Sequence, residues 1–158
     1  MAAALVEMAA RFAPAAGEPG AGEATPLAIE ARRARAAALE LAERELESYG
    51  PVLEALRSDA GPRRDERLRA ALSQAADAPL EIAACSARVA ELGVAALAAG
   101  GEHLRGDALT GVLLAEAARA AAVELVEIDL AGFDRDPRRR EALRHGDNAA
   151  AARRRALG

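Results

Sequence analysis

The sequence predicts an all-α fold, an up-and-down bundle of long helices that becomes dimeric through helix packing. Apolar residues recur at helical spacing along the chain, and no stretch shows the alternation of a strand. Prolines and glycines stand where such helices would begin and end. Hydrophobic residues make up 52% of the 158 residues, but much of this is alanine and aromatics are only 2%. Such helices bury little area each, so they gain by covering a face with another subunit.

The first 57 residues predict two helices separated by a loop. The first helix covers residues 1–13, and the Pro- and Gly-rich stretch 14–24 predicts a flexible loop. Thr25-Pro26 is a good start for a long helix, which Gly50-Pro51 kinks or breaks before it ends at Arg57. We expect an apolar stripe on each helix to pack against a neighbour. The stripes comprise Ala4, Leu5, Met8 and Phe12 in the first helix and Leu39, Ala42, Leu46, Tyr49, Leu53 and Leu56 in the second.

Three further helical segments are predicted, two in the middle of the chain and one at its C-terminal end. Pro62 opens a helix, which Asp77-Ala78-Pro79 interrupts or restarts. Residues 80–99 carry few charges, which predicts a central helix buried on most sides. Asp136-Pro137 begins an Arg-rich last segment, so residues 133–158 are expected to be a basic helix or tail with a solvated, fraying end.

The longest helical pattern runs from His103 to Leu130. Asp107 and Asp129 fall on its apolar face, where a carboxylate needs a partner or a function. The alternatives are that Asp107 caps the helix and that Asp129 lies at a frayed end. The two are 22 positions apart, or about 30 Å along a helix, so only two antiparallel copies could unite them in one site. The apolar face comprises Leu114, Ala118, Ala121, Ala122 and Leu125, and the polar face Glu116, Arg119, Glu124 and Glu127.

Composition excludes several classes of function. A net charge of -4 and so few aromatics argue against nucleic acid as a partner. All 21 basic residues are arginine, which excludes a lysine Schiff base and a P-loop lysine. The single cysteine, Cys85, excludes an internal disulfide, fits a reducing compartment and is expected to be a small core residue. We expect no signal peptide, membrane-spanning run or metal site, and a cytoplasmic location.

Four stretches, taken in order, resemble the cyclodeaminase/cyclohydrolase family of folate enzymes, which includes the C-terminal half of formimidoyltransferase-cyclodeaminase. The family's first helix is similar to AAALVEMAARF, and its Asp-x-Asp helix is similar to LAERELESYGPVLEALR. Its Pro-Leu helix looks like DAPLEIAACSARVAEL. Its helix from Ser-Asp to Ile-Asn-Leu is similar to HLRGDALTGVLLAEAARAAAVELVEIDL. The resemblance covers most of residues 1–132.

The resemblance implies a helical homodimer, one domain over residues 1–158, that acts on one-carbon derivatives of tetrahydrofolate without a further cofactor. The family's reactions are loss of ammonia from 5-formiminotetrahydrofolate with closure of the methenyl ring, and hydration of that ring to the 10-formyl compound. Carboxylates suit both, because they stabilise the cationic amidine-like group and move a proton. The implied catalytic residues are Glu45 and Asp107, and the implied substrate-binding residues are Glu43, Gly100, Gly101, His103 and Asp129.

The chain departs from the family's pattern at several polar positions. The family has a Gly-rich segment before its first helix and this sequence begins after it, so we expect a late start assignment or loss of that loop. Glu43 and Glu45 stand for Asp-x-Asp, Gly106 for the serine before Asp107, and Asp129 for the asparagine. Two alternatives stay open. One is a family member without catalysis that acts as a dimeric folate-binding or interaction module, and the other is an unrelated scaffold whose leucine seam pairs with a partner helix.

Overall fold

The fold is known from a computed structural model that describes residues 1–13 and 25–158, so the predicted loop at 14–24 lies outside the described residues. Every regular element in these two ranges is an α-helix, which confirms the predicted fold class. The helices are α1 (Ala2–Phe12), α2 (Pro26–Ser48), α3 (Gly50–Arg57), α4 (Pro62–Ala75), α5 (Asp77–Ala99), α6 (Glu102–Asp129) and α7 (Pro137–Leu157).

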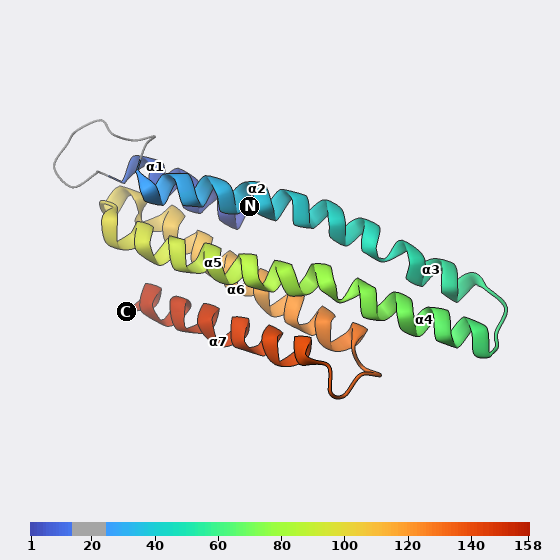
Figure 1. Cartoon of the computed structure of the whole chain (residues 1–158). Coiled ribbons are helices and arrows are strands. Elements are labelled where there is room, and N and C mark those ends of the chain that lie inside the picture. Colours follow the sequence, from blue (N-terminus) through green and yellow to red (C-terminus); the bar gives the residue numbers. More distant parts are fainter. Residues whose placement is uncertain (14–24) are drawn as a thin grey trace.

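The helices run up and down around α5, as predicted for the segment 80–99. α5 contacts α1, α2, α6 and α7. α2 continues into α3 and α4 continues into α5, so these four form a long hairpin whose α3–α4 tip extends beyond α6 and α7 (Figure 1). α6 then returns along α5, and α7 runs back beside both (Figure 1).

Two predicted interruptions of the helices are confirmed. α2 ends at Ser48 and α3 begins at Gly50, with Pro51 in the first turn of α3, where its missing N–H leaves no ladder bond unmade. The second interruption is Ala76, which joins α4 to α5 with helical dihedrals, φ −62° and ψ −17°. The chain direction is therefore kept there, and Pro79 sits in the first turn of α5.

Side-chain caps confirm two of the predicted helix starts and correct a third. Thr25 Oγ1 accepts a hydrogen bond from the Ala28 N–H at 3.1 Å, and Asp136 Oδ1 accepts one from the Arg138 N–H at 2.9 Å. The prediction that Asp107 caps a helix is wrong, because α6 already begins at Glu102, with Gly101 as its cap residue. The Gly106-Asp107 pair is thus helical, since the intrinsic cost of one glycine is small against the packing of a long helix.

The C-terminal segment is a packed helix, which corrects the expectation of a fraying tail. α7 runs for 21 residues to Leu157. Its small side chains fit closely against α5 and α6, so the alanine-rich face provides contact where larger side chains would not fit. The buried members are Ala142, Gly146, Ala149, Ala152 and Ala156.

The buried face of α1 differs from the predicted stripe. Met8 and Phe12 are exposed, whereas Ala3, Val6 and Ala10 are buried. Glycines on the facing helices decide this outcome, because a Cβ on Gly93 of α5 would lie 3.3 Å from Val6 Cγ2 and a Cβ on Gly111 of α6 only 2.7 Å from it. The two glycines let α1 approach through its small side chains.

The faces of α6 that are buried and exposed also differ from the prediction. Part of its polar face lies against α7, where Glu127 pairs with Arg139 and Arg119 packs on Gly146, whereas Glu124 is exposed. Of the predicted apolar face, Ala122 is buried, whereas Leu114, Ala118, Ala121 and Leu125 are exposed. The leucine seam of α2 and α3 is exposed too, with Leu46 83% exposed. Nothing within the described chain covers either stripe.

One apolar stretch is long enough to cross a membrane, which corrects the expectation that there is none. It lies within the helical run Pro62–Ala99 and has a mean hydropathy of 1.6. The assignment of this stretch as a possible membrane span rests on its length and composition alone. In the fold α5 is surrounded by four other helices, as the core helix of a bundle is.

Candidate functional site

Two carboxylates, Glu45 of α2 and Asp129 of α6, come together beside the segment where α4 continues into α5. Asp129 is 6% exposed, so the expectation of a frayed, solvated end is wrong. Oε2 of Glu45 is buried and has no hydrogen-bond partner among the described residues. The two helices do not pack on one another directly, but each contacts both α4 and α5. The α4–α5 run thus holds the two carboxylates in position.

The surroundings of this pair disfavour two negative charges. Burial raises the pKa of the Glu45 carboxyl, and the negative charge of Asp129 raises it further. Burial also raises the pKa of Asp129. A carboxylate pair in such surroundings either holds a proton or attracts a cation, because both relieve the repulsion and the lost hydration. The site can therefore bind a cationic group and exchange a proton with it.

A cavity of about 280 Å³ lies beside Asp129, at the end of α6. Its walls come from α4 and from the turn that leads to α7, and they are apolar except for three charged residues. The cavity gives Asp129 a route to ligands despite its burial. Its lining includes Asp65, Leu68, Arg69, Leu72, Ile128, Gly132 and Phe133.

The remaining residues implied by the resemblance divide between two places. Glu43 is exposed on α2, two residues from Glu45 and therefore on a different side of the helix. Asp107 is half-buried near the start of α6, about 30 Å along the helix from Asp129. Of the other three, Gly100 and Gly101 connect α5 to α6, and His103 lies in the first turn of α6. One chain thus brings Glu45 to Asp129 and leaves the group around Asp107 at the opposite end of α6.

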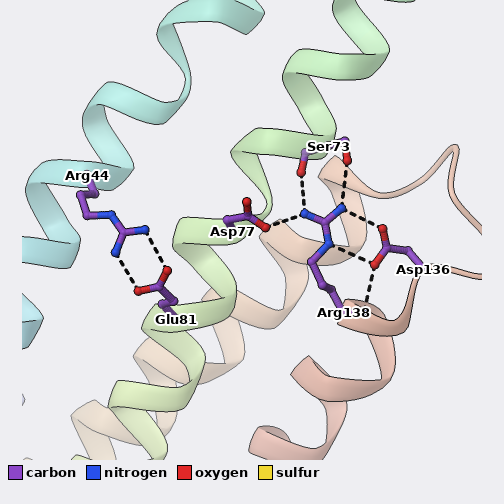
Figure 2. A network of polar contacts seen from close by, with 6 residues as sticks. All are labelled: Arg44, Ser73, Asp77, Glu81, Asp136 and Arg138. Carbon is purple, nitrogen blue, oxygen red and sulfur yellow. Dashed lines mark hydrogen bonds and ion pairs between the residues drawn. The ribbon is translucent and has the colours of Figure 1, made fainter.

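An ion pair next to Glu45 attaches α2 to α5. Nη1 and Nη2 of Arg44 donate to the two carboxylate oxygens of Glu81 at 2.7 and 2.8 Å (Figure 2). The hydrogen bond from Arg44 lowers the pKa of Glu81, and the same contact raises the pKa of Arg44. Because Arg44 immediately precedes Glu45, the Arg44–Glu81 pair fixes the position of α2 along its axis and its rotation at the candidate site.

Arg138 ties the start of α7 to the α4–α5 joint (Figure 2). Its Nη1 donates to the Ser73 carbonyl and to Asp77 Oδ1, both at 2.6 Å. Its Nε donates to Asp136 Oδ1 at 3.0 Å, and its Nη2 donates to Asp136 Oδ2 at 2.7 Å and to Ser73 Oγ at 2.9 Å. The side-chain and backbone hydrogen bonds from Arg138 to Asp136 lower the pKa of Asp136 to about 2. The network therefore fixes the α4–α5 joint, beside which Glu45 and Asp129 lie.

Sequence reasoning missed both of these networks. Their partners are 37 positions apart for Arg44 with Glu81 and 61 apart for Arg138 with Asp77. No helical spacing links residues so distant, and each side chain stands in a run of similar charges. The one local signal was Asp136 before Pro137, which marks a helix cap and which the sequence did reveal.

Together the fold and the site define an all-α bundle in which the half-buried Glu45 lies near the buried Asp129, and Asp129 borders a largely apolar cavity. The chain belongs to the formiminotransferase-cyclodeaminase family, whose sequence profile matches residues 1–148. This confirms the family that the four stretches resemble. Among solved structures, the crystal structure of formiminotetrahydrofolate cyclodeaminase from Thermotoga maritima has a similar fold, with a TM-score of 0.78 and 22% sequence identity over 99% of this chain and 79% of that chain. No curated protein matches the sequence.

Proposed function

We propose that the protein is a folate one-carbon enzyme that acts as a formimidoyltetrahydrofolate cyclodeaminase. The observation that carries the proposal is the buried, unpartnered oxygen of Glu45 next to the buried carboxylate of Asp129. Such a pair attracts a cation more strongly than it would in water, because the surroundings are less polarisable. The protonated formimino group of the substrate is such a cation, and membership of the family supports folate chemistry.

The proposed reaction moves one proton between two nitrogens of the substrate. N10 attacks the amidinium carbon on N5 and loses its proton, and the former imino nitrogen takes up a proton and leaves as ammonia. Glu45 is the proposed carrier, because its raised pKa brings the carboxyl closer to exchange at neutral pH. Asp129 is proposed to stabilise the positive charge, which persists from the amidinium to the methenyl product.

We propose a homodimer in which a second copy covers the exposed apolar stripes. An apolar groove of about 320 Å³ is lined by residues of α2, α5 and α6 and by the start of α1. Ala42 and Leu114 face this groove from its two sides. The stripe on α6 keeps an alternating spacing of four and three residues, which suits packing of one helix on another copy of itself. Its exposed members are Leu114, Ala118, Ala121, Leu125 and Ile128.

The dimer also gives Asp107 a role that one chain does not. If the two α6 helices pack antiparallel, the Asp107 end of one copy lies near the Asp129 end of the other. Asp107 would then be the second proton-handling group, with Gly100, Gly101 and His103 beside it as substrate contacts. Glu43 would contact substrate from the rim of α2. We propose no cofactor besides the folate, and a cytoplasmic location, where folate derivatives would be at hand.

The direct test is to mix the purified protein with 5-formiminotetrahydrofolate and follow the absorbance of the methenyl product. We expect turnover, and a loss of about 100-fold or more in kcat for Glu45→Gln, because proton transfer at this site would be lost. Glu47→Gln is the matched control, an exposed carboxylate two residues away on α2, and should keep the wild-type rate.

Other outcomes of this assay assign the protein elsewhere. Loss of methenyl absorbance from added methenyltetrahydrofolate, with no gain from the formimino compound, would indicate the family's hydration reaction instead. Rates equal to buffer for both substrates, together with measurable tetrahydrofolate binding in a titration, would indicate the non-catalytic binding module.

A further inference from the structure

Arg69 of α4 stands at the rim of the cavity beside Asp129 with no acidic partner. Its Cζ lies 5.4 Å from the centroid of the Phe133 ring, and its Nη2 donates to the Gly132 carbonyl at 3.3 Å. Both partners are uncharged. No carboxylate of the described residues lies within ion-pair distance of Arg69. The guanidinium is thus held in place by a ring and a carbonyl, while its charge remains available.

The rest of the cavity is suited to an aromatic or aliphatic group. Leu68 and Leu72 line it from α4, Ile128 lines it from α6, and Phe133 adds a ring face. Asp65 also borders it, one turn before Arg69, but this exposed side chain has its nearest cation in Arg64 at 3.9 Å. The cavity is therefore lined by a buried carboxylate, an apolar wall and an exposed guanidinium.

We infer that Arg69 and Phe133 form the subsite for the p-aminobenzoyl-glutamate arm of the folate, an inference that rests on the proposed function. The benzoyl ring of a folate is bonded to N10, the atom that would close the ring, so it must lie directly beside the reacting centre. The pteridine, the other candidate for this space, has no carboxylate for Arg69 to pair with. The glutamyl carboxylates do, and guanidinium–carboxylate pairing is strong and directional.

The test uses the arm by itself, so that binding does not depend on turnover. p-Aminobenzoyl-glutamate is titrated calorimetrically into the full chain and into the variants Arg69→Gln, Phe133→Leu and Arg67→Gln. We expect about tenfold weaker binding for Arg69→Gln, because one charge-assisted contact is lost. Arg67→Gln is the matched control, an exposed arginine on α4 that does not line the cavity, and should bind as the wild type does.

A second ligand separates the two parts of the subsite. p-Aminobenzamide keeps the ring and its amide but carries no carboxylate, so it should bind wild type and Arg69→Gln equally but bind Phe133→Leu more weakly. Equal affinity of wild type and Arg69→Gln for p-aminobenzoyl-glutamate would overturn the subsite, as would tetrahydrofolate binding with no detectable binding of the arm. Thermal melts establish that each variant is folded.

Turnover of 5-formiminotetrahydrofolate by the same variants tests the subsite and the proposed function separately. We expect Arg69→Gln to raise KM with little change in kcat, since it binds the arm away from the reacting atoms. Turnover with an unchanged KM would reject the subsite and keep the function. Arg69-dependent binding of the arm without any turnover would reject the enzyme and keep the subsite.

Discussion

Arg44 and Glu81 face one another with both guanidinium–carboxylate contacts below 3 Å, and they join α2 to α5 at the residue that precedes Glu45. Both side chains are 51% exposed, so water weakens the attraction between them. The pair thus adds little to stability, but its two-point geometry restricts how α2 can rotate. Position, rather than free energy of folding, is what it contributes to the site.

We therefore expect Glu81→Gln to lower kcat by about threefold to tenfold, since small displacements of a catalytic group are costly, while the thermal midpoint barely changes. Steady-state kinetics and a thermal melt measure the two effects. Glu91→Gln is the control, because the exposed ion pair of Glu91 with Arg88 lies within α5 and does not join two helices. Parallel losses of activity in both variants would show that the position of α2 is not the cause.

The raised pKa of Glu45 predicts a stabilising substitution at the proposed catalytic residue. An acid whose pKa is higher in the folded state destabilises the fold wherever it is ionised in the unfolded chain, that is, above its ordinary pKa. Glu45→Gln removes that charge, so it should raise the free energy of unfolding at pH 7 by about 1 kcal/mol. The gain should shrink as the pH falls towards 4, where wild-type Glu45 becomes protonated.

Urea unfolding of wild type and Glu45→Gln at pH 7 and pH 4 measures this difference in the free energy of unfolding. Glu47→Gln serves again as the exposed control and should change stability little at either pH. If Glu45→Gln destabilises the protein at pH 7, the carboxylate has a favourable partner in the fold, and its assignment to a cation site is wrong.

Asp136 predicts the opposite dependence on pH. Hydrogen bonds from the side chain and backbone of Arg138 lower its pKa to about 2, so its contribution is present above its ordinary pKa of 3.8 and is lost as the pH falls through the folded-state value. Asp136→Asn keeps an oxygen that can cap the helix but loses the charge-assisted contacts with Arg138, so it should cost about 1 kcal/mol at pH 7. The difference from wild type should narrow between pH 4 and pH 2.

The free energy of unfolding, measured at a series of pH values from 7 down to 2, tests the pH range in which Asp136 loses its contribution. Asp134→Asn is the control, because Asp134 is 93% exposed and has one long contact of 3.9 Å with Arg139. A cost for Asp136→Asn that stays constant down to pH 2 would mean that the carboxylate charge is not what stabilises the start of α7.

The features that could be predicted from sequence are those with local causes. Thr25 before Pro26 and Asp136 before Pro137 mark helix starts because a side-chain oxygen meets a nearby N–H. Gly50-Pro51 breaks the long helix because proline cannot continue the hydrogen-bond ladder. Such signals act within four residues, so the element order and most boundaries follow from them.

The features that could not be predicted depend on distant residues. The buried face of α1 is decided by Gly93 and Gly111, which no pattern within α1 reveals. In sequence, Glu45 is one of many charges on a polar helix, and only the fold places it beside Asp129. The resemblance to the family pointed to both residues, and the physical reason for their pairing came from the structure.

The proposed dimer makes a prediction that a monomeric site does not share. If Glu45 and Asp129 of one subunit work with Asp107 of the other, then Glu45→Gln and Asp107→Asn homodimers are each inactive. A heterodimer of the two variants has one doubly mutated site and one intact site. Equal co-expression with random pairing should therefore restore about a quarter of the wild-type activity.

Differently tagged subunits and two-step purification isolate the heterodimer, which should carry half of the wild-type activity per dimer. Ala118→Glu places a charge in the exposed stripe of α6 and should therefore prevent dimerisation. Light scattering should show monomers, and the kinetic assay should show no activity. Leu143→Glu, an exposed leucine of α7 outside both stripes, should remain dimeric. An inactive heterodimer would mean that each site is built within one chain, because Glu45 and Asp107 would then be needed on the same subunit.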